Sequence, residues 1–125
     1  MANLFRCGSN QNSNLGNETV ISFGSKYDGY YTPKALYFND NYWMQVSVSG
    51  NYNGTLTLQA KKKVTLKKVI LYANRVAPRI IVNGTTYSLV NDSTLDILIE
   101  VGDTVALVGN LSSSDDYAMV TIICE

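Results

Sequence analysis

The chain has 125 residues, 46% of them hydrophobic and 16% charged, so it can fold as one domain around its own core. Ten basic and ten acidic residues leave no net charge, which argues against nucleic acid as a partner. No apolar run approaches the ~18 residues of a membrane-spanning helix, so we expect no membrane partner. The chain has no histidine, the commonest general base and metal ligand.

Residues 1–17 are rich in Asn, Ser and Gly and hold few apolar side chains. This composition predicts an extended N-terminal arm over 1–17, followed by a single β domain over 18–125. Leu4 and Phe5 are the candidate contacts through which the arm docks on a neighbouring copy; the alternative is a frayed terminus. The first residues lack the basic start and apolar centre of a signal peptide, so we expect synthesis in the cytoplasm without secretion.

From residue 19 onward, short runs of β-branched, aromatic and alternating apolar residues are separated by turn residues. This pattern predicts an all-β fold, an antiparallel β-sandwich of jelly-roll type. A short strand is expected within the loop-like segment 27–43. The other predicted strands are 19–23, 43–49, 55–60, 64–73, 79–83, 86–90, 95–101, 104–108 and 117–124.

Two turns are predicted from residue type. Asn83-Gly84 lies between apolar β-formers and predicts a type I′ hairpin, because both residues tolerate positive φ. Gly102-Asp103 predicts a turn after which 104–108 returns as a strand. A central position for the first hairpin implies that Gly84→Val is more damaging than Gly54→Val.

Seven of the thirteen aromatic residues lie between Tyr27 and Trp43. Clustered Tyr and Trp side chains on loops suit stacking on sugars or contact with a protein receptor. The candidate residues for glycan or receptor contact are Tyr30, Tyr31, Tyr42 and Trp43. The alternative is that members of the cluster close the ends of the sandwich core.

Charge is distributed unevenly along the chain. Residues 1–79 hold ten basic and three acidic residues, a net charge of +7, and residues 80–125 hold seven acidic and no basic residues, a net charge of −7. These charges can pair between neighbouring strands of one chain, or between faces of adjoining copies. Cys7 and Cys124 are expected to be two free thiols, although a disulfide would join the two ends.

No catalytic, cofactor or metal motif is present. The sequence holds no P-loop, nucleophile elbow or Cys-x-x-Cys pair, and its aspartates match no calcium-loop spacing. Five Asn-X-Ser/Thr triplets are interpreted as turn chemistry. We therefore expect a protein that is not an enzyme and that has no cofactor and no metal.

The segment from Leu95 to Leu107 consists of a strand, a Gly-Asp turn and a second strand, followed by a polar loop and a last apolar strand over 117–124. This order resembles the final strands of trimeric jelly rolls of the tumour-necrosis-factor and complement-globular-head kind. The resemblance covers about 30 residues. It implies a jelly-roll sandwich that assembles with copies of itself, a trimer being favoured over a dimer.

The chain as a whole resembles small accessory virion proteins of tailed bacteriophages. The likeness lies in the Met-Ala-Asn-Leu-Phe start, the Asn/Ser/Gly-rich arm and the Tyr-rich β domain. It implies a structural role in the virion, as a capsid decoration, head-fibre or tail component, with homo-oligomerisation and other virion proteins as partners. The alternative function is a glycan- or receptor-binding module for host attachment.

Overall fold

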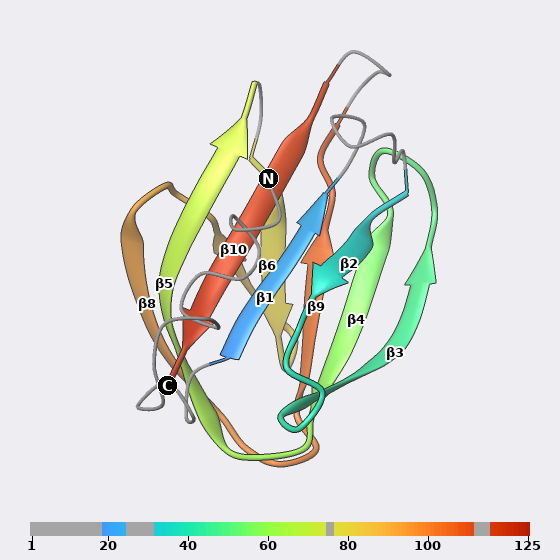
Figure 1. Ribbon diagram of the computed structural model, residues 1–125. Coiled ribbons are helices and arrows are strands. Elements are labelled where there is room, and N and C mark those ends of the chain that lie inside the picture. Colours follow the sequence, from blue (N-terminus) through green and yellow to red (C-terminus); the bar gives the residue numbers. More distant parts are fainter. Residues whose placement is uncertain (1–18, 25–31, 75–76, 112–115) are drawn as a thin grey trace.

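The computed structural model describes residues 19–24, 32–74, 77–111 and 116–125, which form ten strands and no helix. The strands make two five-stranded antiparallel sheets that pack face to face as a β-sandwich (Figure 1). Sheet A has the order β2 (Lys34–Tyr37), β1 (Thr19–Gly24), β10 (Ala118–Cys124), β5 (Val64–Ala73) and β8 (Ser93–Ile99). Sheet B has the order β3 (Trp43–Ser49), β4 (Thr55–Ala60), β9 (Thr104–Val108), β6 (Arg79–Val82) and β7 (Thr85–Ser88). The predicted all-β sandwich is confirmed, including the short strand expected within 27–43.

The strands pair in a nested order along the chain. The first strand, β1, pairs with the last strand, β10, while β4 pairs with β9, β5 with β8 and β6 with β7. The strands on either side of the Gly102-Asp103 turn therefore lie in different sheets and do not pair with each other. The turn instead joins the two layers, and it is fixed by bonds from Gly102 N to Ala60 O and from Ala60 N to Asp103 O. A sequence pattern identifies a strand, but long-range pairing decides the sheet to which it belongs.

The core lies between the two sheets and is formed by side chains that alternate along the strands. In β4, for example, Leu56, Leu58 and Ala60 point inward and are buried, while the residues between them are partly exposed. This period of two is what burial of one face of a strand requires. The largest fully buried side chains are Trp43, Ile21, Leu56, Leu58, Leu66, Ile80, Ile99, Leu107, Ile122, Val64 and Val69.

The Asn83-Gly84 hairpin is confirmed, but its position differs from the expected one. Asn83 and Gly84 have φ values of 48° and 85°, and they join β6 to β7. The strand β7 is an edge of sheet B, so the hairpin is not central, and a Cβ on Gly84 would meet no atom within 4 Å.

Gly54 is the more constrained glycine. A Cβ at this position would lie 2.6 Å from Gly50 O and 2.7 Å from Pro33 Cδ. The carbonyl oxygen of Gly54 also accepts a hydrogen bond from Gly109 N at 2.8 Å. The expectation that substitution of Gly84 is the more damaging is therefore reversed, because backbone atoms close around Gly54 leave no room for a side chain.

We predict that Gly54→Ala lowers the free energy of unfolding by about 3 kcal/mol, because the added methyl group must displace backbone. Gly84→Ala should cost only about 1 kcal/mol, which is the strain of an L-residue at positive φ. Denaturant unfolding of the two variants measures the difference. Equal losses of stability would show that the loop 50–54 is not packed as described.

Candidate interaction surfaces

Four of the described aromatic residues belong to the core or pack against it, namely Trp43, Phe38, Tyr42 and Tyr87. Trp43 is 0% exposed, so its indole offers no surface for a sugar or a receptor, contrary to the expectation from sequence. Tyr42 is partly buried against the core, and Lys62 Nζ lies 5.2 Å from the centroid of its ring. Tyr30 and Tyr31 lie outside the described residues, as do Leu4 and Phe5 of the arm. Of the candidate residues that lie within the described ranges, Trp43 belongs to the core and Tyr42 packs against it, so these two do not form an exposed platform for a glycan.

Opposite charges from the two halves of the chain pair between β5 and β8. Lys67 Nζ lies 2.6 Å from Asp96 Oδ1, and Lys68 Nζ lies 2.8 Å from Asp92 Oδ1. The hydrogen bond from Lys68 lowers the pKa of Asp92, and the hydrogen bond to Asp96 raises the pKa of Lys67. Part of the charge asymmetry is therefore satisfied within one chain, which weakens the argument that it serves to join copies.

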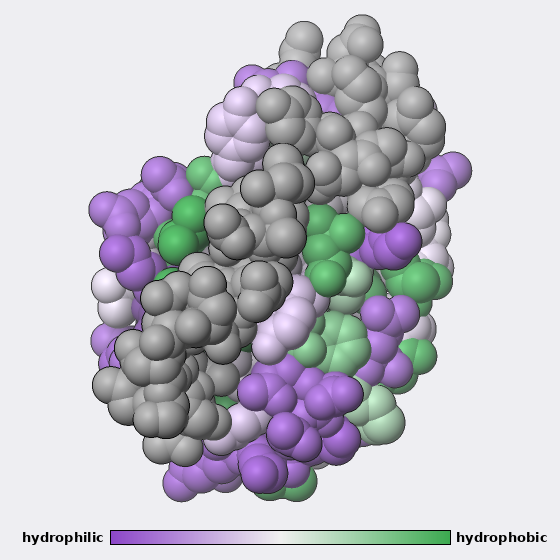
Figure 2. Space-filling model, viewed as in Figure 1, coloured by the Kyte–Doolittle hydropathy of each residue, from purple (hydrophilic) through white to green (hydrophobic). Residues whose placement is uncertain are grey.

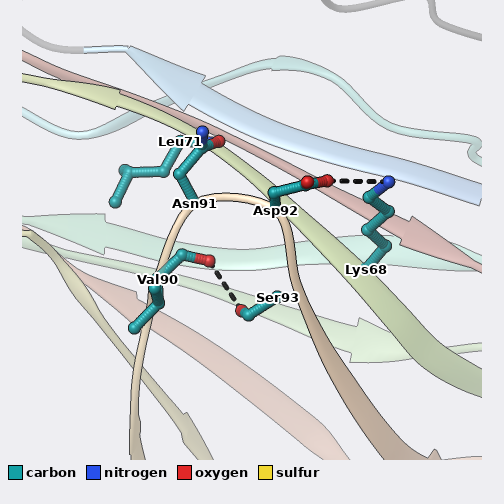
Figure 3. A network of polar contacts seen from close by, with 6 residues as sticks. All are labelled: Lys68, Leu71, Val90, Asn91, Asp92 and Ser93. Carbon is teal, nitrogen blue, oxygen red and sulfur yellow. Dashed lines mark hydrogen bonds and ion pairs between the residues drawn. The ribbon is translucent and has the colours of Figure 1, made fainter.

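The turn between β7 and β8 is a polar network with a structural role (Figure 3). Asn91 Oδ1 accepts a hydrogen bond from Leu71 N at 2.8 Å, and Asp92 N donates to Val69 O at 2.8 Å. Ser93 Oγ donates to Val90 O at 2.6 Å, and Asp92 has a φ of 64°. The turn thereby continues the pairing along β5, and the Asn91 triplet is turn chemistry, as expected.

The described residues provide no recognisable catalytic centre. No group of three or more His, Cys, Asp or Glu side chains that could hold a metal ion occurs in the described ranges. Within the same ranges, no helix is long and apolar enough to cross a membrane. Cys124 is a free thiol in the core, and burial raises its pKa well above the ordinary value of 9.0, which makes it unreactive. Cys7 lies outside the described residues.

The outward face of sheet A carries apolar side chains and two small hydroxyl side chains across its centre. The register places Val20 of β1 beside Ile123 of β10, and Ser22 beside Thr121 and then Ile70 of β5. These outward residues alternate with inward core residues such as Ile21 and Ile122. We call this group, together with Met119, the outer strip; its members are Val20, Ser22, Ile70, Met119, Thr121 and Ile123.

Four of the six members of the outer strip are shielded from solvent and Ile70 and Ile123 are partly exposed, although no described strand packs over the strip. Met119 is 3% exposed, and Val20, Ser22 and Thr121 are also buried. Farther from β1 on the same face, Tyr72 and Leu98 are about half exposed. Figure 2, which looks onto this face, shows hydrophilic residues along the left and lower margins and separate hydrophobic patches between them and the right-hand side. A sandwich sheet that faces water on one side usually carries polar residues there, so this face is suited to contact with protein.

The second apolar surface is the edge strand β3. Met44, Val46 and Val48 are each 41–53% exposed, and among the described strands β3 pairs with β4 alone. Between Trp43 and Ser49 the strand carries no charged residue and no proline. An exposed, uncharged edge is a template for pairing with another strand.

Comparison of the chain with protein-family models, with curated proteins and with solved structures found no match. The two surfaces above therefore carry the functional argument. Sequence reasoning predicted the strands that build them but did not single out either surface. The signal for the outer strip is the run Met119-Val120-Thr121-Ile122-Ile123, in which both alternating sets of side chains are apolar or small.

We predict that Lys68→Gln raises the pKa of Asp92 toward its ordinary value of 3.8. Because the pair lowers this pKa in the folded state, it favours folding above the ordinary carboxyl pKa and is lost as pH falls through the lowered value. An NMR titration of the Asp92 carboxyl group measures the shift, with Lys67→Gln as the matched control that leaves Asp92 unchanged. An identical Asp92 pKa in wild type and Lys68→Gln would contradict the ion pair.

Trp43→Ala should lower the free energy of unfolding by about 3–5 kcal/mol, because it removes the largest fully buried side chain from the core. Tyr42→Ala should cost less, since that ring is only partly buried. Thermal or denaturant unfolding of the two variants measures the losses. A Trp43→Ala variant as stable as wild type would place the indole outside the core.

Proposed function

We propose that the protein is a non-enzymatic structural component of a bacteriophage virion, a capsid decoration, head-fibre or tail protein that assembles with copies of itself and docks on the virion. The observation that carries the proposal is the outer strip of sheet A. A central strand with apolar side chains on both faces needs a protein layer on each side. One layer is sheet B, and we assign the other layer to the arm, either of the same copy or of a neighbouring copy.

The proposed sandwich is a jelly roll with an extended arm. The pairing is nested, with β1 on β10, β4 on β9, β5 on β8 and β6 on β7. Successive pairs lie alternately in the two facing sheets. This alternation supports a jelly roll, which is wound from such pairs. The resemblance of residues 95–107 to trimeric jelly rolls supports a trimer. Closed rotational symmetry is the usual arrangement of homo-oligomers.

The arm is the second element of the proposal. Residues 1–17 lead directly into β1, whose Val20 and Ser22 belong to the outer strip. Leu4 and Phe5 are apolar anchors in an otherwise polar segment. We assign them to contacts on this face, where they would exclude water from the strip of a neighbouring copy.

The glycan-binding alternative has less support. Of its four candidate residues, Trp43 is fully buried and Tyr42 is packed partly against the core. Tyr72 does lie near Tyr117, with ring centroids 5.1 Å apart, but this pair joins β5 to the start of β10 and does not form a separate platform. The exposed apolar edge strand β3 favours protein partners over sugars.

Light scattering on the full chain and on a shortened chain that begins at Asn17 tests the proposal. The full chain should have the mass of an oligomer, whereas the shortened chain should lose assembly and keep its β-sheet circular dichroism spectrum. The double variant Leu4→Asp with Phe5→Asp should behave as the shortened chain does. A matched control, Asn10→Asp with Asn12→Asp, adds the same charge to the arm without removing an apolar anchor. Monomers at tens of micromolar for every one of these chains, with and without the other virion components, would contradict self-assembly.

A further inference from the structure

The four sheet edges of the sandwich differ in how well they are protected against pairing with another chain. The edge strands β2 and β7 are only four residues long, and Pro33 and Lys34 stand at the start of β2. The edge strand β8 carries Asp96 at a φ of 55°, opposite a register shift between Leu66 and Lys68 of β5. Short length, proline, charge and bulges are the usual means of blocking an edge. Three of the four edges are therefore protected against pairing with another chain.

The fourth edge, β3, lacks most of these devices. It is seven residues long, and after Trp43 every residue in it is exposed. Its register against β4 shifts between Gln45 and Ser47, so Val46 is a bulge residue, but no charge accompanies the bulge. Met44, Val46 and Val48 present apolar side chains along the open edge. This combination favours strand addition, in which backbone hydrogen bonds extend the sheet.

We propose that β3 pairs with β3 of a second copy in antiparallel orientation, across a two-fold axis at Val46. This axis places Val46 opposite Val46 of the second copy, and Met44 opposite Val48 of the second copy. The strand is therefore complementary to itself, since no charge on it meets a like charge. Sheet B continues into the sheet B of the second copy, a contact separate from the outer strip of sheet A.

The charges around β3 select the antiparallel orientation. Near Trp43 the neighbouring chain carries Asp40 and the exposed run Lys61–Lys63, and Lys61 Nζ donates to Asp40 O at 2.6 Å. Near Ser49 the following loop, residues 50–54, has no charged residue. Antiparallel pairing places the lysine run of one copy beside the uncharged loop of the other. Parallel pairing would bring two lysine runs together, which like-charge repulsion disfavours.

The contact is small for an interface. One pair of seven-residue strands falls short of the ~1,200–2,000 Å² that a stable interface buries, so β3 pairing is weak for an isolated pair. Its strength grows when several copies held together present several such edges. A two-fold contact of this kind would link larger units without using the outer strip, so the inference does not rest on the proposed virion role.

Sedimentation equilibrium over a range of concentrations tests the pairing on wild type, Val46→Lys and Thr86→Lys. The control adds the same charge to the other edge of sheet B, where Thr86 is exposed on β7. At high concentration, Val46→Lys should have half the molecular mass of wild type, whether the unit that pairs through β3 is a monomer or a larger oligomer. Thr86→Lys should match wild type, and all three proteins should melt at the same temperature.

Equal masses for wild type and Val46→Lys at every concentration would overturn the proposal, as would an equal loss of mass in Thr86→Lys. Equal masses for wild type and Val46→Lys are also expected if β3 pairs only with an extended peptide of a different protein. If Val46→Lys fails to fold, Ser47→Asp introduces like charges across the same axis and should also halve the mass. The two proposals can fail separately. If the chain that begins at Asn17 loses assembly while Val46→Lys keeps the mass of wild type, β3 pairing is wrong and the role of the arm stands.

Discussion

The last strand of the chain lies at the centre of sheet A, and the rest of the structure depends on covering both of its faces. Val120 and Ile122 point into the sandwich, while Met119 and Thr121 point the other way, and all four are buried. Burial of apolar surface is the main favourable contribution to folding, at roughly 25 cal/mol per Å². Sheet B covers the inner face of β10. The outer face of β10 is the basis of the proposal that an arm and assembly cover it.

The nested pairing places β1, the first described strand, beside β10, the last one. Thr19 lies opposite Cys124, so the chain enters sheet A beside the place where it leaves. The same order makes most contacts non-local, because β1 and β10 are separated by almost the whole chain. Folds of this kind close their long loops late and fold slowly.

Local sequence patterns predicted most of the strands, because alternation and turn residues are local signals. Leu95, Ile97 and Ile99 alternate as expected, and Asn83-Gly84 forms the expected turn. The pairing partners were not predictable in this way, so the edge position of the Asn83-Gly84 hairpin was missed. Crowding at Gly54 arises from Pro33 and from its own loop, which only the folded chain brings together.

The candidate surfaces were less predictable than the fold. The aromatic cluster is visible in the sequence, yet burial of Trp43 depends on its place opposite Ala60 at the end of sheet B. The exposure of β3 follows from its being an edge, which its apolar sequence alone does not indicate. The outer strip is partly predictable from residues 119–123, because neither the inward nor the outward side chains of this run are charged.

Methionine oxidation measures most directly whether the outer strip is covered. Met44 is 47% exposed on β3 and Met119 is 3% exposed on β10, so the two report on the open edge and on the outer strip. With dilute peroxide, we predict rapid oxidation of Met44 in both the full chain and the chain that begins at Asn17. Met119 should stay reduced in the full chain and become reactive in the shortened one. Oxidation of Met119 as fast as Met44 in the full chain would contradict the account, because the outward face of sheet A would then be open to water.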